Sequence, residues 1–341
     1  MARDEPPGAK KGVKSDVAIT LLWRTDIHLS DHTPRSRKDN WTETVLGKLA
    51  QIGDLARDLK ATAVLDGGDF FDLKSPSRNS HALVRQAIEV HRAYPCPVYA
   101  NVGNHDCVYG DYSFLPQQPL GVMYESGAFR RCYDEHEALF LSDDGTTVRV
   151  VGVPYHGTAY DLERFRRIKK GSEDYLVVIA HVLASKDGGT LFEAEDVIKY
   201  ADLDAFDGDV FCFGHWHKDQ GIVETPGGKT VVNIGSLTRG SLSQDDLARI
   251  PSVARLDFSP EGIEATKIPL KHTPASEVFD LVAKDQTDLR ASMMEEFVDH
   301  LQAALAPSAQ GSLRDAIRNL PGVPDEVKEQ AVLYVEKAGG R

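Results

Sequence analysis

Short apolar runs alternate with longer amphipathic segments through most of the chain. The runs are rich in β-branched residues and predict strands at 16–23, 61–66, 98–102, 147–153, 175–180, 209–214, 229–235 and 252–258. Residues 40–60 and 80–94 carry apolar positions at helical spacing. The early alternation of strand and helix predicts βαβ crossovers and a largely parallel sheet, whereas the more closely spaced later strands predict antiparallel pairs. We therefore predict an α/β fold.

The last part of the chain has a different pattern. Residues 288–305 carry an apolar residue every four positions, which predicts an amphipathic helix, and two shorter helical segments follow. We predict a disordered leader at 1–15, a main domain at 16–270 and a helical C-terminal appendix at 271–341 that caps the domain or docks a partner.

Composition excludes some classes of protein. The chain has 341 residues, of which 41% are hydrophobic and 27% charged, an ordinary globular balance. Its four cysteines form no C-x-x-C pair, so neither a zinc knuckle nor a disulfide framework is indicated, and a reducing cytosol fits best. No apolar run suits a membrane span or a secretory signal. The net charge of −13 argues against a general polyanion binder.

Metal-ligand side chains follow five of the predicted strands, at the point where each strand ends. In α/β sheets these carboxyl ends are where sites assemble. Within Asp-x-His and His-x-His, an extended backbone would send both side chains to the same side. Such imidazole and carboxylate ligands could hold two divalent ions and suit Mn, Fe or Zn better than Ca or Mg. The set is Asp26, His28, Asp69, Asn104, His181, His215 and His217.

Each member alone has a structural interpretation. His215 and His217 could reflect polar alternation in a strand, and Asp69 could be a turn residue after two glycines. His181 could be a hydrogen-bonded core histidine, and Asn104 could be a left-handed turn residue. Five strand ends that all carry suitable residue types favour a metal site over these separate explanations.

The motifs at these strand ends also resemble a known family. "DIH", "GGDFFD", "GNHD", the isolated His181 and "GHWH" are similar, in order, to the five signature blocks of calcineurin-like metallophosphoesterases. A narrower likeness joins "GDFFDLKSPS", "GNHD" and "GHWHKDQGIV…VNIGSLTRGS". These segments resemble the SbcD-type nuclease subunit of the bacterial SbcC–SbcD DNA-repair complex and phage recombination nucleases of that kind.

The resemblance implies a fold and a set of metal ligands. The fold would be a four-layer α/β-β/α sandwich with two sheets packed face to face. Two metal ions, with Mn(II) favoured over Fe, Zn or Mg, would share Asp69 as a bridging ligand. The first ion would add Asp26, His28 and His217, and the second Asn104, His181 and His215.

The motif "GNHD" supplies the expected catalytic pair. His105 is its one imidazole without a metal to bind, and it can donate a proton to the leaving oxygen. Asp106 would orient that ring, and Gly103 would let the backbone turn. The roles of His32 and Asp72 stay open.

The leading hypothesis is a Mn-dependent DNA exo- or endonuclease subunit that acts in repair or recombination. Its expected partners are DNA, an SbcC-like ATPase and a second copy of the chain, in the cytoplasm of a bacterium or encoded by a phage. Alternatives are a phosphatase or phosphodiesterase for a small molecule or phosphoprotein, and a non-catalytic scaffold. The basic residues Arg35, Arg37 and Lys38 are expected to contact a nucleic-acid backbone. The basic stretch 163–170 is either a second such surface or a solvated face.

Overall fold

The computed structural model describes residues 19–108, 111–189 and 194–281, together with 317–318, 324–325, 327–329 and 332. The predicted leader at 1–15 and the predicted helix at 288–305 lie outside the described residues. The chain divides into two units, 1–279 and 280–341. The fold and the site below belong to the first unit. No helix in the described part of the chain is long and apolar enough to cross a membrane.

Two six-stranded sheets form the centre of the first unit. The first sheet has the order β14-β13-β1-β2-β3-β4, in which β1 to β4 run parallel and β13 pairs antiparallel with both β1 and β14. Its strands are β1 (Ile19–Arg24), β2 (Ala63–Asp66), β3 (Val98–Ala100), β4 (Arg130–Arg131), β13 (Ser252–Ser259) and β14 (Gly262–Pro269).

The second sheet has the order β11-β12-β10-β7-β6-β5. Its four inner strands run parallel, and β5 and β11 pair antiparallel at the two edges. Its strands are β5 (Glu137–Leu141), β6 (Thr147–Val153), β7 (Tyr175–His181), β10 (Val210–Gly214), β11 (Asp219–Glu224) and β12 (Thr230–Ile234). A separate two-stranded ribbon joins β8 (Ala184–Ser185) to β9 (Ile198–Lys199).

Helices cover the outer faces of both sheets. The two helices predicted from periodicity are present and begin after side-chain caps: Asn40 accepts from Glu43 N and Ser80 from Leu83 N. The helices are α1 (Trp41–Asp58), α2 (His81–Arg92), α3 (Pro119–Glu125), α4 (Glu163–Arg167), α5 (Gln244–Ala248) and α6 (Ala275–Val278).

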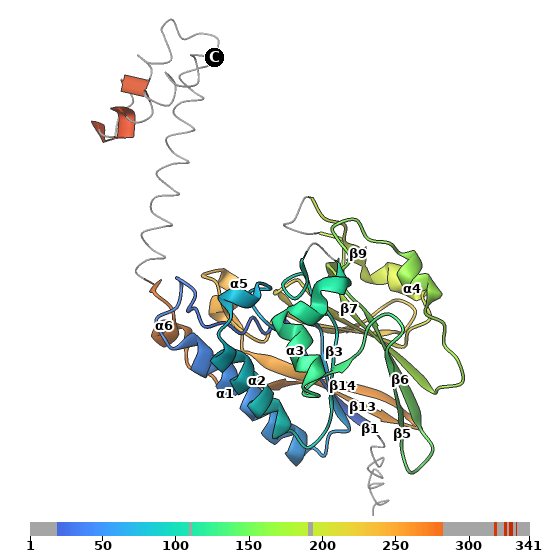
Figure 1. Cartoon of the computed structure of the whole chain (residues 1–341). Coiled ribbons are helices and arrows are strands. Elements are labelled where there is room, and N and C mark those ends of the chain that lie inside the picture. The colour runs from blue at the N-terminus through green and yellow to red at the C-terminus, as the bar shows by residue number, and fades with distance from the viewer. Residues whose placement is uncertain are drawn as a thin grey trace, which may run out of the picture. The chain divides into compact units, whose positions relative to one another are not determined.

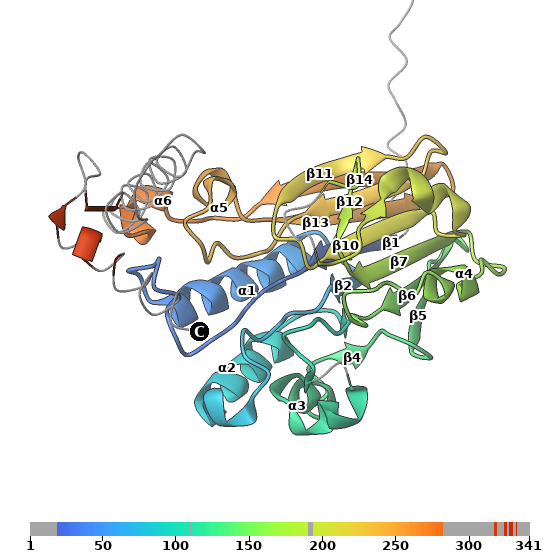
Figure 2. The ribbon, with the colours of Figure 1, turned by 90° about the horizontal axis from the view of Figure 1, so that it is seen from above.

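Three apolar cores separate the layers. One lies between the first sheet and helices α1, α2 and α3, and a second lies between the two sheets. The third lies on the far side of the second sheet, where α4 packs. Figure 1 shows the helices and strands of this unit, and Figure 2 shows α1 and α2 on one side of the strands and α4 on the other. This arrangement confirms the predicted α/β fold with two stacked sheets.

The edge strands β5, β11 and β14 and helix α3 are among the elements that were not predicted from the sequence. In β5, β11 and β14 much of the surface stays open to solvent, so the apolar pattern that marks a buried strand is weak. Helix α3 lies in a stretch for which no element was predicted, and it begins at a proline.

Candidate metal centre

The ends of five parallel strands bring the predicted ligands together. Strands β1, β2 and β3 of the first sheet and β7 and β10 of the second end at the same place. The residues gathered here form three overlapping groups, and within each group the ligand atoms lie within 4.8 Å of one another. These groups are Asp26, His28 and His217; His28, Asp69 and His105; and Asp69, His181 and His215.

The backbone is strained at four of the seven predicted ligands. Asp26, His28, Asp69 and His215 have φ values of 52°, 49°, 53° and 96°. A non-glycine residue in this region costs about 1–3 kcal/mol and persists only where the surroundings enforce it, which occurs mainly at functional sites. The ligands therefore converge through left-handed turns, not through the extended alternation expected for Asp-x-His.

The first ligand group surrounds the side chain of Asp26. Its Oδ1 lies 3.5 Å from His217 Nε2 and 4.0 Å from His28 Nε2. The two imidazole Nε2 atoms are 3.0 Å apart. His28 Nε2 also lies 3.9 Å from Asp69 Oδ2, so Asp69 borders this group.

The second ligand group surrounds the other side of Asp69. His181 Nε2 lies 3.3 Å from Asp69 Oδ2 and 3.1 Å from the side-chain oxygen of Asn104. His215 completes the group with Asp69 and His181. Asp69 thus belongs to the second group and borders the first, which is the position required of a bridging ligand.

The charge distribution of the centre suits cations. Burial opposes ionisation of Asp26 and Asp69, but the neighbouring imidazoles hold the pKa of both carboxyls far below its ordinary value. Burial also opposes a charge on His181, yet Asp69 raises its pKa to about 10. Metal ligation needs neutral imidazoles and ionised carboxylates. Cations that bind here would therefore displace the protons held by the imidazoles. The donor set and its overlap at Asp69 fit two divalent ions.

Neighbouring groups fix the orientation of the ligand rings. The carbonyl oxygen of Gly67 accepts from His181 Nδ1 at 2.9 Å, which leaves Nε2 to face Asp69. The carboxylate of Asp72 lies 3.4 Å from His28 Nδ1 and supports that ring in the same way. Asp72, whose role the sequence analysis left open, therefore supports the ring of His28.

Glu195 is a residue of the site that the sequence analysis missed. Its Oε1 lies 3.0 Å from His215 Nε2 and accepts the hydroxyl of Tyr160 at 2.6 Å. With Nε2 occupied, Nδ1 of His215 is the nitrogen left for a cation. Glu195 belongs to no motif in the sequence, so only the tertiary contact with His215 identifies it.

His105 lies beside the first ligand group. Its ring meets the ring of His28 edge-on, with centroids 4.8 Å apart, and its side chain is 41% exposed. The carbonyl oxygen of Asp72 lies 2.6 Å from His105 Nδ1 and accepts from it, so Nε2 is the free nitrogen. The backbone N–H of His105 donates to Asp69 Oδ1 at 2.7 Å. The ring is thus positioned and still reachable.

The structure corrects the role predicted for Asp106. This buried carboxylate accepts backbone N–H groups from Asp69 at 2.6 Å, Gly103 at 3.0 Å and Phe70 at 3.1 Å. Both oxygens are occupied by amides, while the His105 ring is held by Asp72. Burial, with the nearby charge of Asp69, raises the pKa of Asp106 to about 8, and the amide donors act in the opposite direction. Asp106 therefore joins the loops after β2 and β3.

Gly103 has a different function from the turn expected of it. A Cβ at this position would lie 2.1 Å from Asp69 Oδ1 and 2.5 Å from Asp69 N. Gly68, with φ of 102°, would likewise bring a Cβ to 2.5 Å from Gly103 N. The two glycines allow the loops to approach closely enough for Asp69 to reach both ligand groups.

The structure separates the three basic residues of the 34–38 run. Arg35 and Lys38 are exposed. Arg37 is buried, because its guanidinium donates to both carboxylate oxygens of Asp39 and to the carbonyl oxygen of Arg239. Its expected contact with a nucleic-acid backbone is therefore corrected to a structural one, and only Arg35 and Lys38 remain predicted DNA contacts.

Two cavities meet at the centre. One, of about 390 Å³, is lined by Trp216 and Lys218, and we call it the Trp216 opening. The other, of about 360 Å³, is lined by Trp41 together with the exposed His32, and we call it the Trp41 opening. Both are also lined by His105, His217, Ser241 and Asp246.

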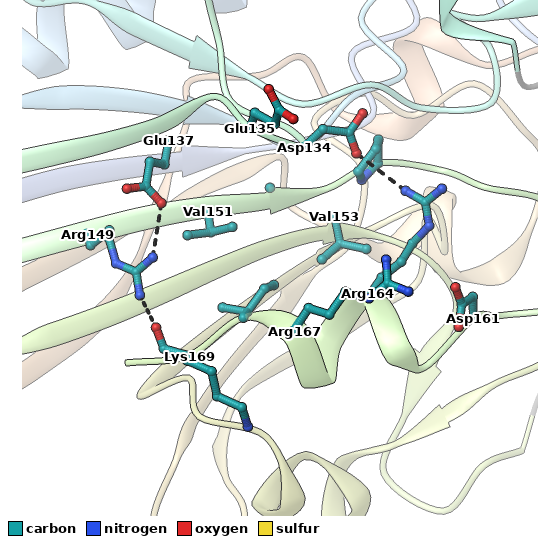
Figure 3. Close-up of a pocket in the computed structure, with 13 residues that line it drawn as sticks. Asp134, Glu135, Glu137, Arg149, Val151, Val153, Asp161, Arg164, Arg167 and Lys169 are labelled. Carbon is teal, nitrogen blue, oxygen red and sulfur yellow. Dashed lines mark hydrogen bonds and ion pairs between the residues drawn. The ribbon is translucent and has the colours of Figure 1, made fainter. Parts of the chain in front are cut away.

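A larger cavity lies away from this centre. It measures about 600 Å³ and lies between β5, β6 and α4, as Figure 3 shows. Arg164 pairs there with Asp134, and Arg149 with Glu137. None of the predicted metal ligands lines it. Within the basic stretch 163–170, four of the cations pair with acidic residues, which favours the solvated-face interpretation: Arg164 with Asp134, Arg166 with Glu163, Lys169 with Asp207 and Lys170 with Asp209.

Comparisons with known proteins agree with the geometry of the site. The sequence profile of the calcineurin-like phosphoesterase family matches residues 19–219. A search of curated proteins gives no match. Among solved structures, a dimetal phosphatase from Danio rerio is similar with a TM-score of 0.50 and 12% identity, over 75% of this chain and 100% of that chain. A Thermus thermophilus protein gives a TM-score of 0.42 and 14% identity, over 73% of this chain and 99% of that one. At these identities the likeness to the Danio rerio protein concerns the fold alone.

Proposed function

The chain belongs to the calcineurin-like phosphoesterase family, and we propose that within it the chain is a Mn(II)-dependent DNA nuclease. The family is one of metal-dependent hydrolases of phosphoesters that bind two divalent ions. The preference for DNA, the identity of the metal and the role in repair or recombination are our proposals. They rest on the likeness to SbcD-type nucleases and on the shape of the site.

The residues of the centre have distinct tasks in this reaction. One ion would be held by Asp26, His28, Asp69 and His217, and the other by Asp69, Asn104, His181 and His215. When bound, two such ions supply Lewis acidity toward the phosphoryl oxygens and an activated water. His105 holds its Nδ1 proton against Asp72 O, so Nε2 is the atom that can pass a proton to the leaving oxygen.

The observation that supports a diester substrate is the pair of openings on either side of His105 and His217. A phosphomonoester has one substituent and needs one opening. A phosphodiester inside a polymer leaves the metal centre in two directions, and the Trp216 and Trp41 openings provide two paths. A substrate strand would then cross the centre with His105 beside the scissile bond.

The exposed basic residues beside the Trp41 opening support a polyanionic substrate. Arg35 directly follows Pro34, which lines that opening, and Lys38 lies three residues further along the chain. Removing one side chain that binds a phosphate should lower the salt slope of DNA binding by about 0.7 to 0.9. We expect Arg35→Ala to weaken binding to all DNA sequences and to flatten the salt dependence, whereas cleavage of a small diester stays unchanged.

A small-molecule phosphodiesterase is the second candidate. The net charge of −13 favours it, because a strongly acidic protein repels DNA at long range. The same metal centre would serve both substrates, so the fold does not choose between them.

The proposed partner is an SbcC-like ATPase or a second copy of the chain, docked through residues after 279. A truncation after Phe279 is the suitable test, because Val278 and Phe279 are buried in the first unit and Arg37 stacks on the Phe279 ring. The truncated chain should keep small-diester hydrolysis and lose binding of the ATPase or self-association. An unchanged oligomeric state and unchanged ATPase binding would remove this docking proposal.

The experiment that tests the proposed function compares substrates with the same Mn(II)-loaded protein. Linear single-stranded DNA, blunt duplex DNA and circular single-stranded DNA are labelled and incubated with wild type and with Asp69→Asn. We expect wild type to cleave DNA and to hydrolyse bis-p-nitrophenyl phosphate faster than p-nitrophenyl phosphate. Cleavage of the circle would indicate endonuclease activity. Preferred hydrolysis of the monoester with intact DNA would overturn the nuclease proposal in favour of a phosphatase.

A further inference from the structure

Trp216 has no structural explanation in the core of the protein. It lies between His215 and His217 in the loop after β10, is partly exposed and lines the Trp216 opening. It belongs to none of the three apolar cores formed by the described residues. The other two tryptophans differ: Trp23 is fully buried, and Trp41 is 2% exposed and donates its indole N–H to the carbonyl oxygen of His28.

The only charged group on the ring of Trp216, among the contacts of the described residues, is Lys218. Its Nζ lies 5.7 Å from the ring centroid, and the side chain is exposed. An exposed cation–π contact is worth about 0.5–1 kcal/mol. A nucleobase stacked on an aromatic ring is worth about 1–3 kcal/mol. A base can therefore displace Lys218 from the ring, and the freed ammonium can then contact a phosphate.

The acidic residues at the same opening do not oppose this. Asp245 and Asp246 both line the Trp216 opening, and both are paired with Arg249. Asp246 also accepts hydrogen bonds from the backbone N–H and hydroxyl of Ser241. The single guanidinium of Arg249 offsets one of these two negative charges, and no carboxylate among the described residues forms an ion pair with Lys218, so its ammonium can meet an anion.

We propose that Trp216 and Lys218 form a binding site for an unpaired nucleotide next to the scissile phosphate, with the base stacked on Trp216 and its phosphate on Lys218. This inference rests on the proposed nuclease function and narrows its substrate class. A base in an intact duplex has both faces stacked on its neighbours and cannot offer one to Trp216. The site therefore selects single-stranded or frayed DNA on this side of the metal centre.

Intrinsic fluorescence can report on this site, because of the three tryptophans Trp23 and Trp41 are buried and Trp216 is the one partly exposed for a base to stack on. Oligo(dT) of about eight nucleotides, within the length that one single-strand binding site covers, is titrated into Mn(II)-loaded protein that carries His105→Ala, which prevents cleavage. We expect saturable quenching that disappears in Trp216→Leu. Affinity for oligo(dT) should fall about tenfold in Trp216→Leu and less than threefold in Trp216→Phe, whereas affinity for a covalently closed circular duplex, which has no end base with a free face, changes less than twofold. Lys218→Ala should lower the salt slope of oligo(dT) binding by about 0.7.

The outcomes separate this inference from the proposed function. If wild type cleaves DNA but Trp216→Leu binds oligo(dT) as tightly as its parent, the stacking site is wrong and the nuclease stands. Equal weakening of single-stranded and duplex binding, or loss of bound metal in Trp216→Leu, would show that Trp216 only supports the loop of His215 and His217. If wild type neither binds nor cleaves DNA, both the nuclease proposal and the stacking site are wrong.

Discussion

The carboxylate of Asp106 accepts the backbone N–H of Asp69 at 2.6 Å, and thereby fixes the residue that lies between the two ligand groups. The same carboxylate accepts from Gly103 N and Phe70 N, so it ties the loop after β2 to the loop after β3. Asp69 has a left-handed φ of 53°, which this contact helps to enforce. The position of the bridging ligand thus depends on a residue that need not touch a metal.

Asp106→Asn should loosen this connection. An amide has a single acceptor oxygen, and its NH₂ group would face a backbone N–H that then lacks a partner. We expect the metal-free variant to lose about 1–3 kcal/mol of unfolding free energy and to bind both ions more weakly. Chemical denaturation and metal titration measure the two effects. Asp111→Asn, at an exposed cap, is the matched control. Two ions bound with wild-type affinity would contradict this role of Asp106.

Asp69→Asn and Asp26→Asn should differ in how many ions they lose. Asp69 lies in the group of His181 and His215 and also borders the first group, with its Oδ2 3.9 Å from His28 Nε2, whereas Asp26 lies only in the group of His28 and His217. We therefore expect Asp69→Asn to weaken both sites and Asp26→Asn mainly one. Metal content after dialysis, measured by elemental analysis, distinguishes them. If Asp69→Asn retains two ions per chain, Asp69 is not the bridge.

The location of the centre could be predicted from the sequence because it depends on two local patterns, the apolar strands and the ligand residues that follow them. Buried parallel strands appear as apolar runs, and ligand types directly after them, such as Asp26 after β1 and His181 at the end of β7, are visible without a structure. The edge strands β5 and β11 gave no such signal, because solvent covers part of their surface.

Tertiary contacts account for what the sequence could not predict. Asp106 lies next to His105 in the chain, yet its partners are amides of the loop after β2. Glu195 has no motif around it and reaches His215 only through folding. Arg37 belongs to a basic run that the sequence predicts to be exposed, but its contacts with Asp39 and with the ring of Phe279 bury it. Such partners depend on which loops meet, and local pattern carries no information about that.

Glu195→Gln should weaken the second metal site selectively. The carboxylate holds the His215 ring in its orientation, and loss of such a partner typically lowers metal affinity about 10- to 100-fold. A stepwise Mn(II) titration by calorimetry should show one weakened step and one unchanged step. Glu224→Gln, on an exposed part of β11, is the control. An isotherm identical to wild type would show that the contact of Glu195 with His215 has no effect on metal binding.

Lys48 predicts a pH dependence of stability. Burial in α1, with Arg239 and Arg37 nearby, lowers its pKa from 10.5 to about 8 in the folded protein, and Asp39 only partly offsets this. Between pH 8 and 10.5 the unfolded chain binds the proton and the folded chain does not, so stability rises with pH. Below pH 8 both states are protonated and the folded state carries the full cost.

Lys48→Met removes that cost. We expect the variant to be about 1–3 kcal/mol more stable than wild type at pH 7, with the gain vanishing near pH 10.5. Thermal unfolding of the metal-free protein at both pH values measures it, and Lys186→Met, at an exposed position, is the control. A gain that is the same at both pH values would mean that packing, not charge, explains the effect.

His105→Ala should separate proton transfer from metal binding. His105 is held by Asp72 O and keeps Nε2 free at both openings, so its loss removes a proton donor and leaves the predicted ligands in place. General acid catalysis is worth about a hundred- to ten-thousand-fold, and that loss should appear in full for a diester with a poor leaving group. A nitrophenyl leaving group needs no proton, so the loss of turnover should be smaller with such a substrate.

Metal content and melting temperature of the variant should match wild type. The control variant His32→Ala, at an exposed position of the Trp41 opening, should stay active. Turnover of the poor substrate within twofold of wild type would remove His105 from the reaction, and an equal defect with both leaving groups would assign it to substrate positioning instead.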